Sequence, residues 1–358
     1  MLGACLAATP AAAGWFTSHA SDALAHVNGQ YVLNRPLADF DDSVFVWTDG
    51  GRARPRVVDL GQLARTLTPY DVVFYGEIHD HAGMHLEELR LLRALYEHDP
   101  RLVLSLEQFE RDVQGVLDDY LADRIGETTL TAKARAWNNY AAAYRPLLVF
   151  AKAHHLPVIA AEAPDWTIAC IGRRGAQILG EFTPQERSWI AAELHAGPGP
   201  YRDRYMEFFK GSASHGGGTA ATPEAAQTAQ HSFEAQAARD DTMAESIERA
   251  VRDYPGRKIL HITGSFHAAG FLGTVERLRL RAPALELAVI EPVEVENPNA
   301  PAFAADRLGE ASALQLVYPT PENFVDGEDM SAWLAKMAQK HAADACKYVP
   351  AAPVKPPG

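Results

Sequence analysis

The sequence predicts an α/β protein with a mainly parallel central sheet, flanked by helices, and a helical lobe inserted over the carboxyl edge of the strands. Three observations support this fold. Short apolar runs alternate along the chain with longer segments of helical periodicity. The interval between the runs at 102–106 and 158–161 is long enough for several helices in addition to a crossover. The apolar content of 47% is sufficient for a sizeable core.

The predicted strands are apolar runs bounded by turn residues. They lie at 44–47, 72–75, 102–106, 158–161, 259–263, 287–290 and 314–317. We expect about five or six of them to form one mainly parallel sheet.

The predicted helices show apolar stripes, charged outer faces or recognisable ends. They lie at 60–67, 84–98, 112–150, 166–179, 183–195, 223–253 and 331–347. The helix at 183 begins at a capping box formed by Thr183 and Glu186, with Pro184 at its first position.

Residues 1–30 are predicted to be a flexible leader, 31–348 a single domain and 349–358 a disordered tail. The helical lobe would comprise about 112–155 and 166–253. The segment 212–222 is rich in Ser, Gly, Ala and Thr, which predicts a mobile loop.

Charge and cysteine content exclude some classes of function. The net charge is −13, with 33 Lys and Arg against 46 Asp and Glu, so nucleic acid is not an expected partner. The three cysteines, Cys5, Cys170 and Cys346, have no zinc-ligand spacing, and their odd number argues against a disulfide framework. We interpret Cys170 as a buried, inert thiol, with pairing to Cys346 as the alternative.

Cys5 ends the tetrapeptide Leu-Gly-Ala-Cys, which has the pattern of a bacterial lipobox. The basic and apolar regions of a signal peptide do not precede it, so either the start codon is placed too late or the match is fortuitous. We expect lipidation at Cys5 and a location in the bacterial cell envelope, lipid-anchored on the periplasmic side.

Acidic and imidazole side chains follow four of the predicted strands. Glu77 and His79 follow the first, Glu107 the second and Glu162 the third; His267 lies in Gly-Ser-Phe-His after the fourth. Because ligand sites in open α/β sheets lie beyond the carboxyl ends of the strands, we expect these side chains to share one cleft. The alternative for each is structural: a helix-capping or loop-bonding acid, or a solvated histidine. His261, within a strand, is interpreted as a core residue.

Other residues suggest a cofactor. His81 and His85 are spaced i, i+4, which suits a metal or a haem edge, or else two surface histidines on a first helical turn. Tyr201 and Tyr205 have the same spacing beside Arg202. A tyrosine can ligate ferric haem and an arginine can pair with its propionates, although an aromatic helical stripe is more often core.

These residues carry a resemblance to the ChaN-like haem-binding family, in the superfamily that also holds the Tiki proteases and erythromycin esterases. The matching segments are 72–85, 104–109, 144–147, 150–151, 156–164, 239–240, 243–244 and 264–267. The resemblance implies an α/β domain that binds haem, as a homodimer sandwiching two haems, in bacterial iron uptake with an outer-membrane haem receptor system. It also implies a tyrosine ligand to iron, which no motif maps here. The chain departs from the family at Glu162 and Asp165, where an amide and a basic residue are expected.

The first functional hypothesis is therefore a haem-binding lipoprotein without catalysis. The alternative is a hydrolase of esters or peptides. In it, Glu77, His79, Glu107 and His267, where the superfamily also places Glu and His, would hold a divalent metal or act directly as acid and base.

Overall fold

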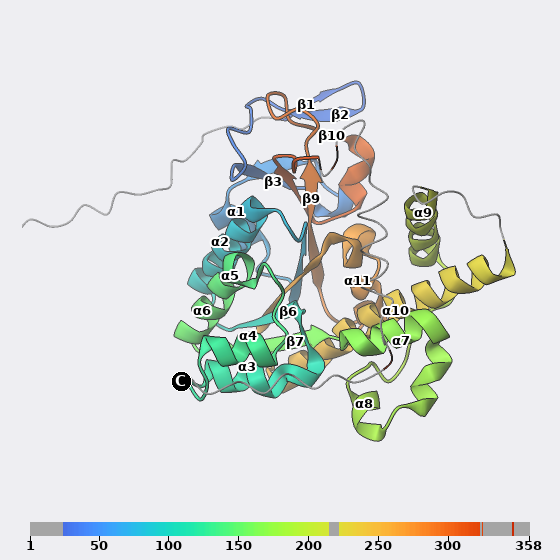
Figure 1. Ribbon diagram of the computed structural model, residues 1–358. Coiled ribbons are helices and arrows are strands. Elements are labelled where there is room, and N and C mark those ends of the chain that lie inside the picture. The colour runs from blue at the N-terminus through green and yellow to red at the C-terminus, as the bar shows by residue number, and fades with distance from the viewer. Residues whose placement is uncertain (1–23, 215–221, 323, 325–345, 347–358) are drawn as a thin grey trace, which may run out of the picture.

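An eight-stranded sheet runs through the centre of the computed structural model, which describes residues 24–214, 222–322, 324 and 346 (Figure 1). Its order is β4-β3-β11-β9-β5-β8-β6-β7. β3 is antiparallel to β4 and β11, and the remaining pairs are parallel. The strands are β3 (Ser43–Trp47), β4 (Arg56–Val58), β5 (Val72–Glu77), β6 (Leu102–Glu110), β7 (Val158–Glu162), β8 (Lys258–Gly264), β9 (Leu287–Glu294) and β11 (Ala313–Val317).

The mainly parallel α/β fold is confirmed and each predicted strand is present, but the sheet has eight strands and not the five or six expected. Two features were not predicted: β4, which is only three residues long, and a small second sheet formed by β1 (Leu24–Val27), β2 (Gln30–Leu33) and β10 (Ala302–Ala304). β1 lies within the predicted leader. β1 pairs with β2 from Leu24 onward, so the predicted leader includes a strand of the fold.

Helices cover both faces of the sheet. They are α1 (Leu60–Thr66), α2 (Ala82–His98), α3 (Gln114–Leu121), α4 (Glu127–Lys133), α5 (Tyr140–Ala143), α6 (Arg145–Ala153), α7 (Asp165–Arg174), α8 (Pro184–Ser188), α9 (Pro200–Ser214), α10 (Pro223–Asp253) and α11 (Thr274–Arg281). The 3-10 helices are η1 (Asp49–Gly51), η2 (Arg111–Val113), η3 (Ala176–Glu181), η4 (Ser265–His267), η5 (Ala269–Phe271) and η6 (Ala305–Gly309).

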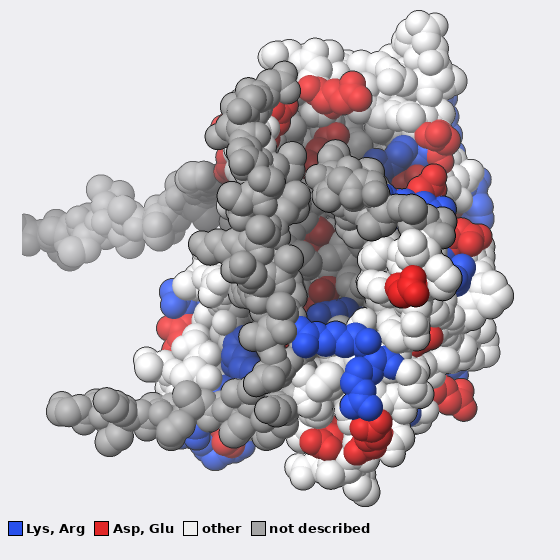
Figure 2. Space-filling model, turned by 45° about the vertical axis from the view of Figure 1, so that its right-hand side comes forward, with Lys and Arg blue, Asp and Glu red and all other residues white. Residues whose placement is uncertain are grey.

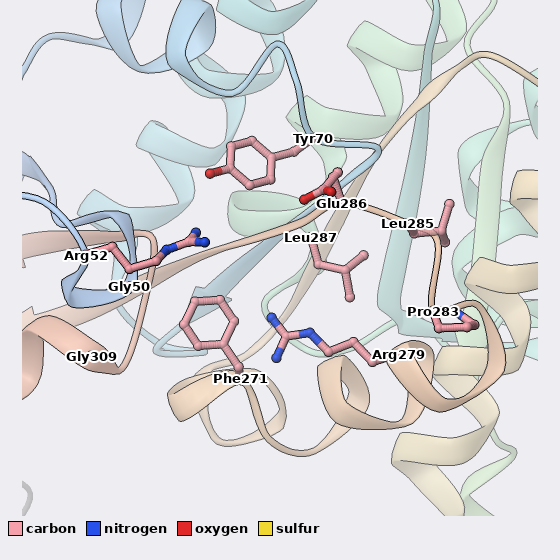
Figure 3. A pocket seen from close by; sticks show the side chains of 10 residues that line it. All are labelled: Gly50, Arg52, Tyr70, Phe271, Arg279, Pro283, Leu285, Glu286, Leu287 and Gly309. Atoms are coloured by element: carbon pink, nitrogen blue, oxygen red, sulfur yellow. The ribbon is translucent and has the colours of Figure 1, made fainter.

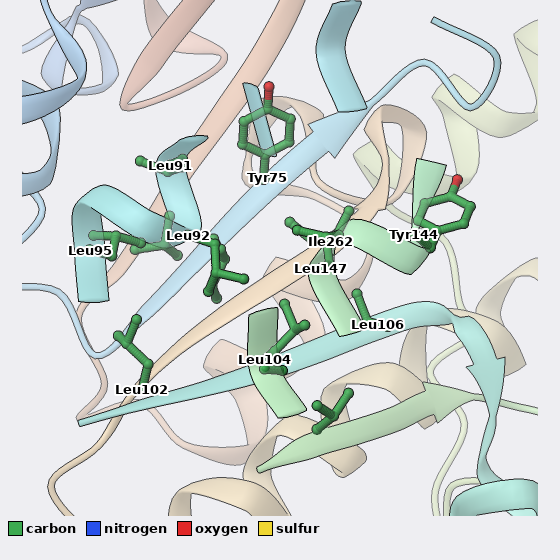
Figure 4. Packing of buried hydrophobic residues seen from close by; sticks show 14 of the residues in the cluster. Tyr75, Leu91, Leu92, Leu95, Leu102, Leu104, Leu106, Tyr144, Leu147 and Ile262 are labelled. Carbon is green, nitrogen blue, oxygen red and sulfur yellow. The ribbon is translucent and has the colours of Figure 1, made fainter. Parts of the chain in front are cut away.

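Alternation along the strands assigns side chains to two apolar cores. One core packs the leucines of α2 and α6 against alternate residues of the strands, among them Tyr75, Leu104 and Ile262 (Figure 4). The other packs α10 and α11 against the intervening residues, such as Phe74 and Val103. Consecutive strand residues therefore face different helical layers.

The helical lobe differs in part from the prediction. Segment 112–155 packs its leucines and tyrosines into the first core, and so flanks the sheet. The α7–α9 segment and the first half of α10 project from the sheet, as Figure 1 shows. The predicted bounds of the long helix, 223–253, are confirmed.

The capping box of α8 is confirmed, but the helix ends at Ser188 and does not reach His195. Arg187 donates instead to the carbonyls of Ile190, Ala191 and Ala192. The amide of Ala191 bonds Thr242 on α10, so tertiary partners replace the helical hydrogen bonds.

Cys170 on α7 forms a disulfide with Cys346, with 4.7 Å between the Cα atoms. The interpretation of Cys170 as a free thiol was wrong, because Cys346 packs against the small apolar cluster between α7 and α10. Most of the predicted helix 331–347, most of the loop 212–222, the tail and Cys5 lie outside the described residues. Within the described ranges, no helix combines the length and the apolar character needed to cross a bilayer.

Candidate functional site

Glu77 is the last residue of β5, and its side chain turns toward α2 and α6. Its Oε1 atom accepts hydrogen bonds from His79 Nδ1 at 2.7 Å, Gln108 Nε2 at 3.1 Å and the Tyr144 hydroxyl at 2.6 Å. The Glu77 side chain is fully buried, whereas that of His79 is 43% exposed. Burial raises the pKa of Glu77, but the hydrogen bond from His79 and further contacts lower it below its ordinary value. His79 is thus held through Nδ1, its Nε2 edge lies against Gly264, and its side chain stays partly exposed.

A second carboxyl lies behind Glu77. On α2, His85 Nδ1 is 3.1 and 3.2 Å from the two oxygens of Glu88 and 3.7 Å from Glu77 Oε2. His85 Nε2 donates to the carbonyl of His79 at 2.8 Å. Burial raises the pKa of Glu88 well above its ordinary value, and the nearby Glu77 carboxylate raises it further. His85 therefore supports the turn that carries His79, as a buried residue and not a surface one.

Glu107 points to the opposite face of the sheet. Its Oε2 atom accepts from the Thr263 hydroxyl at 2.6 Å and from the Gly264 amide at 2.7 Å, and its Oε1 is 3.8 Å from His267 Nε2. Burial would raise the pKa of Glu107, but His267 and His79 lower it to about 2. Glu107 is consequently a carboxylate throughout the physiological range.

His267 in η4 donates from Nδ1 to Asp240 Oδ1 on α10, at 2.8 Å. Asp240 is completely buried and also accepts from the Thr274 and Tyr201 hydroxyls, at 2.8 and 2.5 Å. Burial lowers the pKa of His267, but the carboxylates of Asp240 and Glu107 raise it to about 9. A protonated imidazole between two carboxylates results.

The two groups meet at Gly264, where β8 ends. A Cβ atom on this residue would lie 2.9 Å from the His79 ring and 3.8 Å from Glu107 Oε2. The absence of a side chain lets the His79 ring approach the backbone between the two carboxylates. The predicted convergence of Glu77, His79, Glu107 and His267 at the strand ends is thus present, but as two groups on opposite faces that meet at the edge. Figure 2 shows acidic side chains inside a hollow of the molecular surface.

Glu162, at the end of β7, also reaches this edge. Its Oε2 atom is 2.8 Å from Arg239 Nη1 of α10, and Arg239 Nη2 is 2.8 Å from Asp165. Burial raises the pKa of Glu162 to about 7 despite the opposing effect of Arg239. The resemblance predicts a basic residue in the turn after β7. In this protein the basic group is Arg239 of α10, which pairs with both Glu162 and Asp165.

The structure separates the residues that were predicted to hold haem. Tyr201 is 2% exposed and donates to Asp240. His81 caps α2, accepting from the Met84 amide, and is 1% exposed. Tyr205 is half-buried, with its hydroxyl 2.6 Å from Ser232 Oγ, and Arg202 bonds Gln230 at 3.0 Å. Tyr205 and Arg202 are therefore accessible, whereas Tyr201, His81 and His85 are enclosed.

Several site residues were given no role from the sequence, although all but Glu88 lie in segments that carry the resemblance. They are Glu88, Gln108, Tyr144, Arg239 and Asp240. The available signal was the run Arg239-Asp240-Asp241 in an alanine-rich helix, because charged residues on a packed helical face need partners.

A cavity of about 580 Å³ lies elsewhere, beside Tyr70 and Leu287 (Figure 3). Leu287 pairs with Val72, the first residue of β5, so this cavity is at the amino ends of the strands. Arg52 and Arg279 extend toward it, and it contains none of the predicted site residues.

Comparison of the sequence with models of known protein families identifies a matching family. The family model described as "Haem-binding uptake, Tiki superfamily, ChaN" matches residues 63–278. A solved structure of cofacial haem binding to ChaN of Campylobacter jejuni superposes with a TM-score of 0.55 at 16% identity, covering 77% of this chain and 98% of the other. That likeness shows the fold.

Two further similarities were found. An erythromycin esterase in its open conformation gives a TM-score of 0.39 at 11% identity, covering 82% of this chain and 86% of the other. RETICULATA-RELATED 5, a chloroplastic protein of Arabidopsis thaliana, is 27% identical over 239 residues, which are 66% of this chain. The match spans only 30% of that relative's length.

Proposed function

The chain belongs to the ChaN haem-binding uptake family of the Tiki superfamily, and we propose that it binds haem for haem or iron uptake in a bacterial cell envelope. The observation that carries the proposal is the family match, which includes β5, β6, β7, β8 and the helices that position the site. The mainly parallel sheet shared with the C. jejuni protein supports it at the level of the fold.

We place the macrocycle on the aromatic surface of α9 and η4. Phe208 is 60% exposed, and its ring centroid is 5.5 Å from that of Phe266. The ring centroids of Tyr205 and Phe266 are 6.1 Å apart. A flat, largely apolar ligand gains most of its affinity by covering such a surface.

Tyr205 is the tyrosine that we assign to the iron. Its hydroxyl bonds another hydroxyl, Ser232, whereas Tyr201 is committed to a buried carboxylate. Burial raises the pKa of Tyr205, and binding to ferric iron would displace the phenolic proton. Arg202, one turn before it, would pair with a propionate.

The exposed Phe208 also supports a homodimer in which two such surfaces enclose a pair of haems. The C. jejuni protein binds haem cofacially, and the same arrangement here would bury both aromatic surfaces. A lipid on Cys5 would anchor the protein on the periplasmic side, close to an outer-membrane haem receptor.

We expect haemin added to the purified protein to produce a shifted Soret band that saturates at one haem per chain. Tyr205→Phe should lower the affinity at least about tenfold and change the ferric spectrum, because the ligand oxygen is lost. Tyr254→Phe is the matched control. Tyr254 caps the C-terminus of α10, so this variant should bind haemin like the parent. If Tyr205→Phe leaves both spectrum and affinity unchanged, the assignment of the iron ligand is refuted.

One observation favours a second function, hydrolysis. His79 is oriented by Glu77 through Nδ1 and is partly exposed at the strand ends, and a carboxylate-oriented imidazole is the arrangement of a general base. A panel of esters and peptides would then show turnover that falls at least about 10²-fold in His79→Gln. His154→Gln, on an exposed loop, should retain the activity, and a parent protein without turnover would dismiss this function.

A further inference from the structure

Glu77, His85 and Glu88 form a group whose potential ligand atoms all lie within 4.8 Å of one another. His85 Nδ1 is 3.1 Å from Glu88 Oε1 and 3.7 Å from Glu77 Oε2. A tetrahedral ion with bonds of about 2.0–2.1 Å separates its ligand atoms by roughly 3.4 Å. The two distances from His85 Nδ1, 3.1 and 3.7 Å, lie on either side of this ligand–ligand separation.

Among the described residues, no N–H or hydroxyl group donates to the enclosed Oε2 atom of Glu77, so only a proton shared with Glu88 or a cation can satisfy it. The other oxygen of the same carboxylate receives three donors, and the oxygen without a donor is the one on the side of His85. A buried carboxylate oxygen without a donor is costly, and with no cation present the neighbouring Glu88 avoids a second buried charge by keeping its proton. A divalent cation between them would satisfy the oxygen and neutralise both charges.

The imidazole of His85 is oriented as a metal ligand. Its Nε2–H donates to the carbonyl of His79, which leaves the lone pair of Nδ1 directed at the two carboxylates. A backbone carbonyl commonly fixes the tautomer and the ring orientation of a metal-bound histidine in this way. A nitrogen lone pair and two carboxylates meeting in a buried space need either protons or a metal ion between them.

We propose that Glu77, His85 and Glu88 bind a divalent metal ion of the Zn²⁺ class, separate from the haem surface on α9. One imidazole nitrogen and two carboxylates suit zinc, and their charges sum to zero with the ion. The ion would hold Glu77 Oε2 while Glu77 Oε1 holds His79. The metal is then a structural support for the exposed histidine.

The test uses the full chain, freed of metal with a chelator, dialysed without haem and titrated with Zn²⁺. Elemental analysis after gel filtration should give one zinc per chain, and zinc should raise the melting temperature. Glu88→Gln should retain less than a tenth of that zinc and lose the rise in melting temperature. Its amide mimics a protonated carboxyl, so the fold should persist, as circular dichroism would verify.

Two controls locate the ion. Glu87→Gln alters the adjacent residue of α2, which pairs with Arg90, and should bind zinc like the parent. His267→Gln should also keep its zinc, because His267 belongs to the group around Glu107. A parent protein that takes up no zinc would overturn the proposal in favour of a shared proton. Zinc lost in His267→Gln but kept in Glu88→Gln would overturn it in favour of the other group.

Discussion

Replacement of Asp240 by asparagine should lower the free energy of unfolding by about 3–5 kcal/mol near pH 6, because it leaves the buried charge of His267 without its nearest partner. Asp240 also accepts from the Tyr201 hydroxyl. That hydroxyl already accepts from Gln236 Nε2 at 3.1 Å, so an amide nitrogen at position 240 would offer it a second donor while its own proton has no acceptor there. The substitution therefore removes a charge and misplaces a donor.

The effect should depend on pH in a defined direction. The pKa of His267 is about 9 in the folded protein and 6.5 as its reference value. The stabilisation from a raised pKa is complete below about pH 6.5 and is lost as the pH rises through about 9. The difference between the parent and Asp240→Asn should thus be largest at low pH and shrink toward pH 9.

Urea unfolding followed by circular dichroism at pH 6 and at pH 9 measures this difference. Asp253→Asn, at the exposed end of α10, should change the stability little at either pH. His267→Gln and the double variant complete a cycle that isolates the coupling of the pair. A loss of equal size at both pH values would show that Asp240 does not stabilise the imidazolium.

Gly83→Ala is expected to have the second largest effect, a loss of about 2–3 kcal/mol in the free energy of unfolding. A Cβ atom at residue 83 would lie 2.2 Å from the carbonyl oxygen of Phe40 and 3.2 Å from the His81 ring. The nearest blocking atom, the Phe40 carbonyl oxygen, belongs to the backbone and cannot rotate away as a side chain could. Either the start of α2 or the 39–42 turn must therefore move. The movement would disturb the cap formed by His81 and the position of His85.

Thermal and urea unfolding of Gly83→Ala can be compared with the same substitution at Gly115, near the start of α3. A Cβ atom at Gly115 meets nothing within 4 Å, so alanine should stabilise the protein by a few tenths to about 1 kcal/mol through its higher helix propensity. The two variants should therefore change stability in opposite directions. A Gly83→Ala protein as stable as the parent would mean that α2 is not held against this turn.

The repeated strand-end pattern was sufficient to predict the parallel sheet and the edge at which the site lies. It was not sufficient to assign the faces, since this depends on how far each strand continues. β5 and β6 both extend beyond their apolar runs, so Glu77 and Glu107 are strand residues and not turn residues. Their alternation sends Glu77 toward His85 of α2, and Glu107 toward Thr263 and His267 on the other face.

The partners from helices were harder to predict because they join residues far apart in the chain. Asp240 meets His267 across 27 residues, and Tyr144 meets Glu77 across 67. Sequence periodicity gives the face of a helix but not the neighbour of that face. The accessible position of Tyr205 and the buried one of Tyr201 likewise follow from the packing of α9 on α10 and η4.

Retention of haem through gel filtration tests the central claim most directly. The full-length protein, mixed with excess haemin and separated from free ligand, should retain about one haem per chain by pyridine haemochrome assay. Tyr205→Phe should retain clearly less, and Tyr254→Phe as much as the parent. A parent protein that leaves the column without haem would contradict the account.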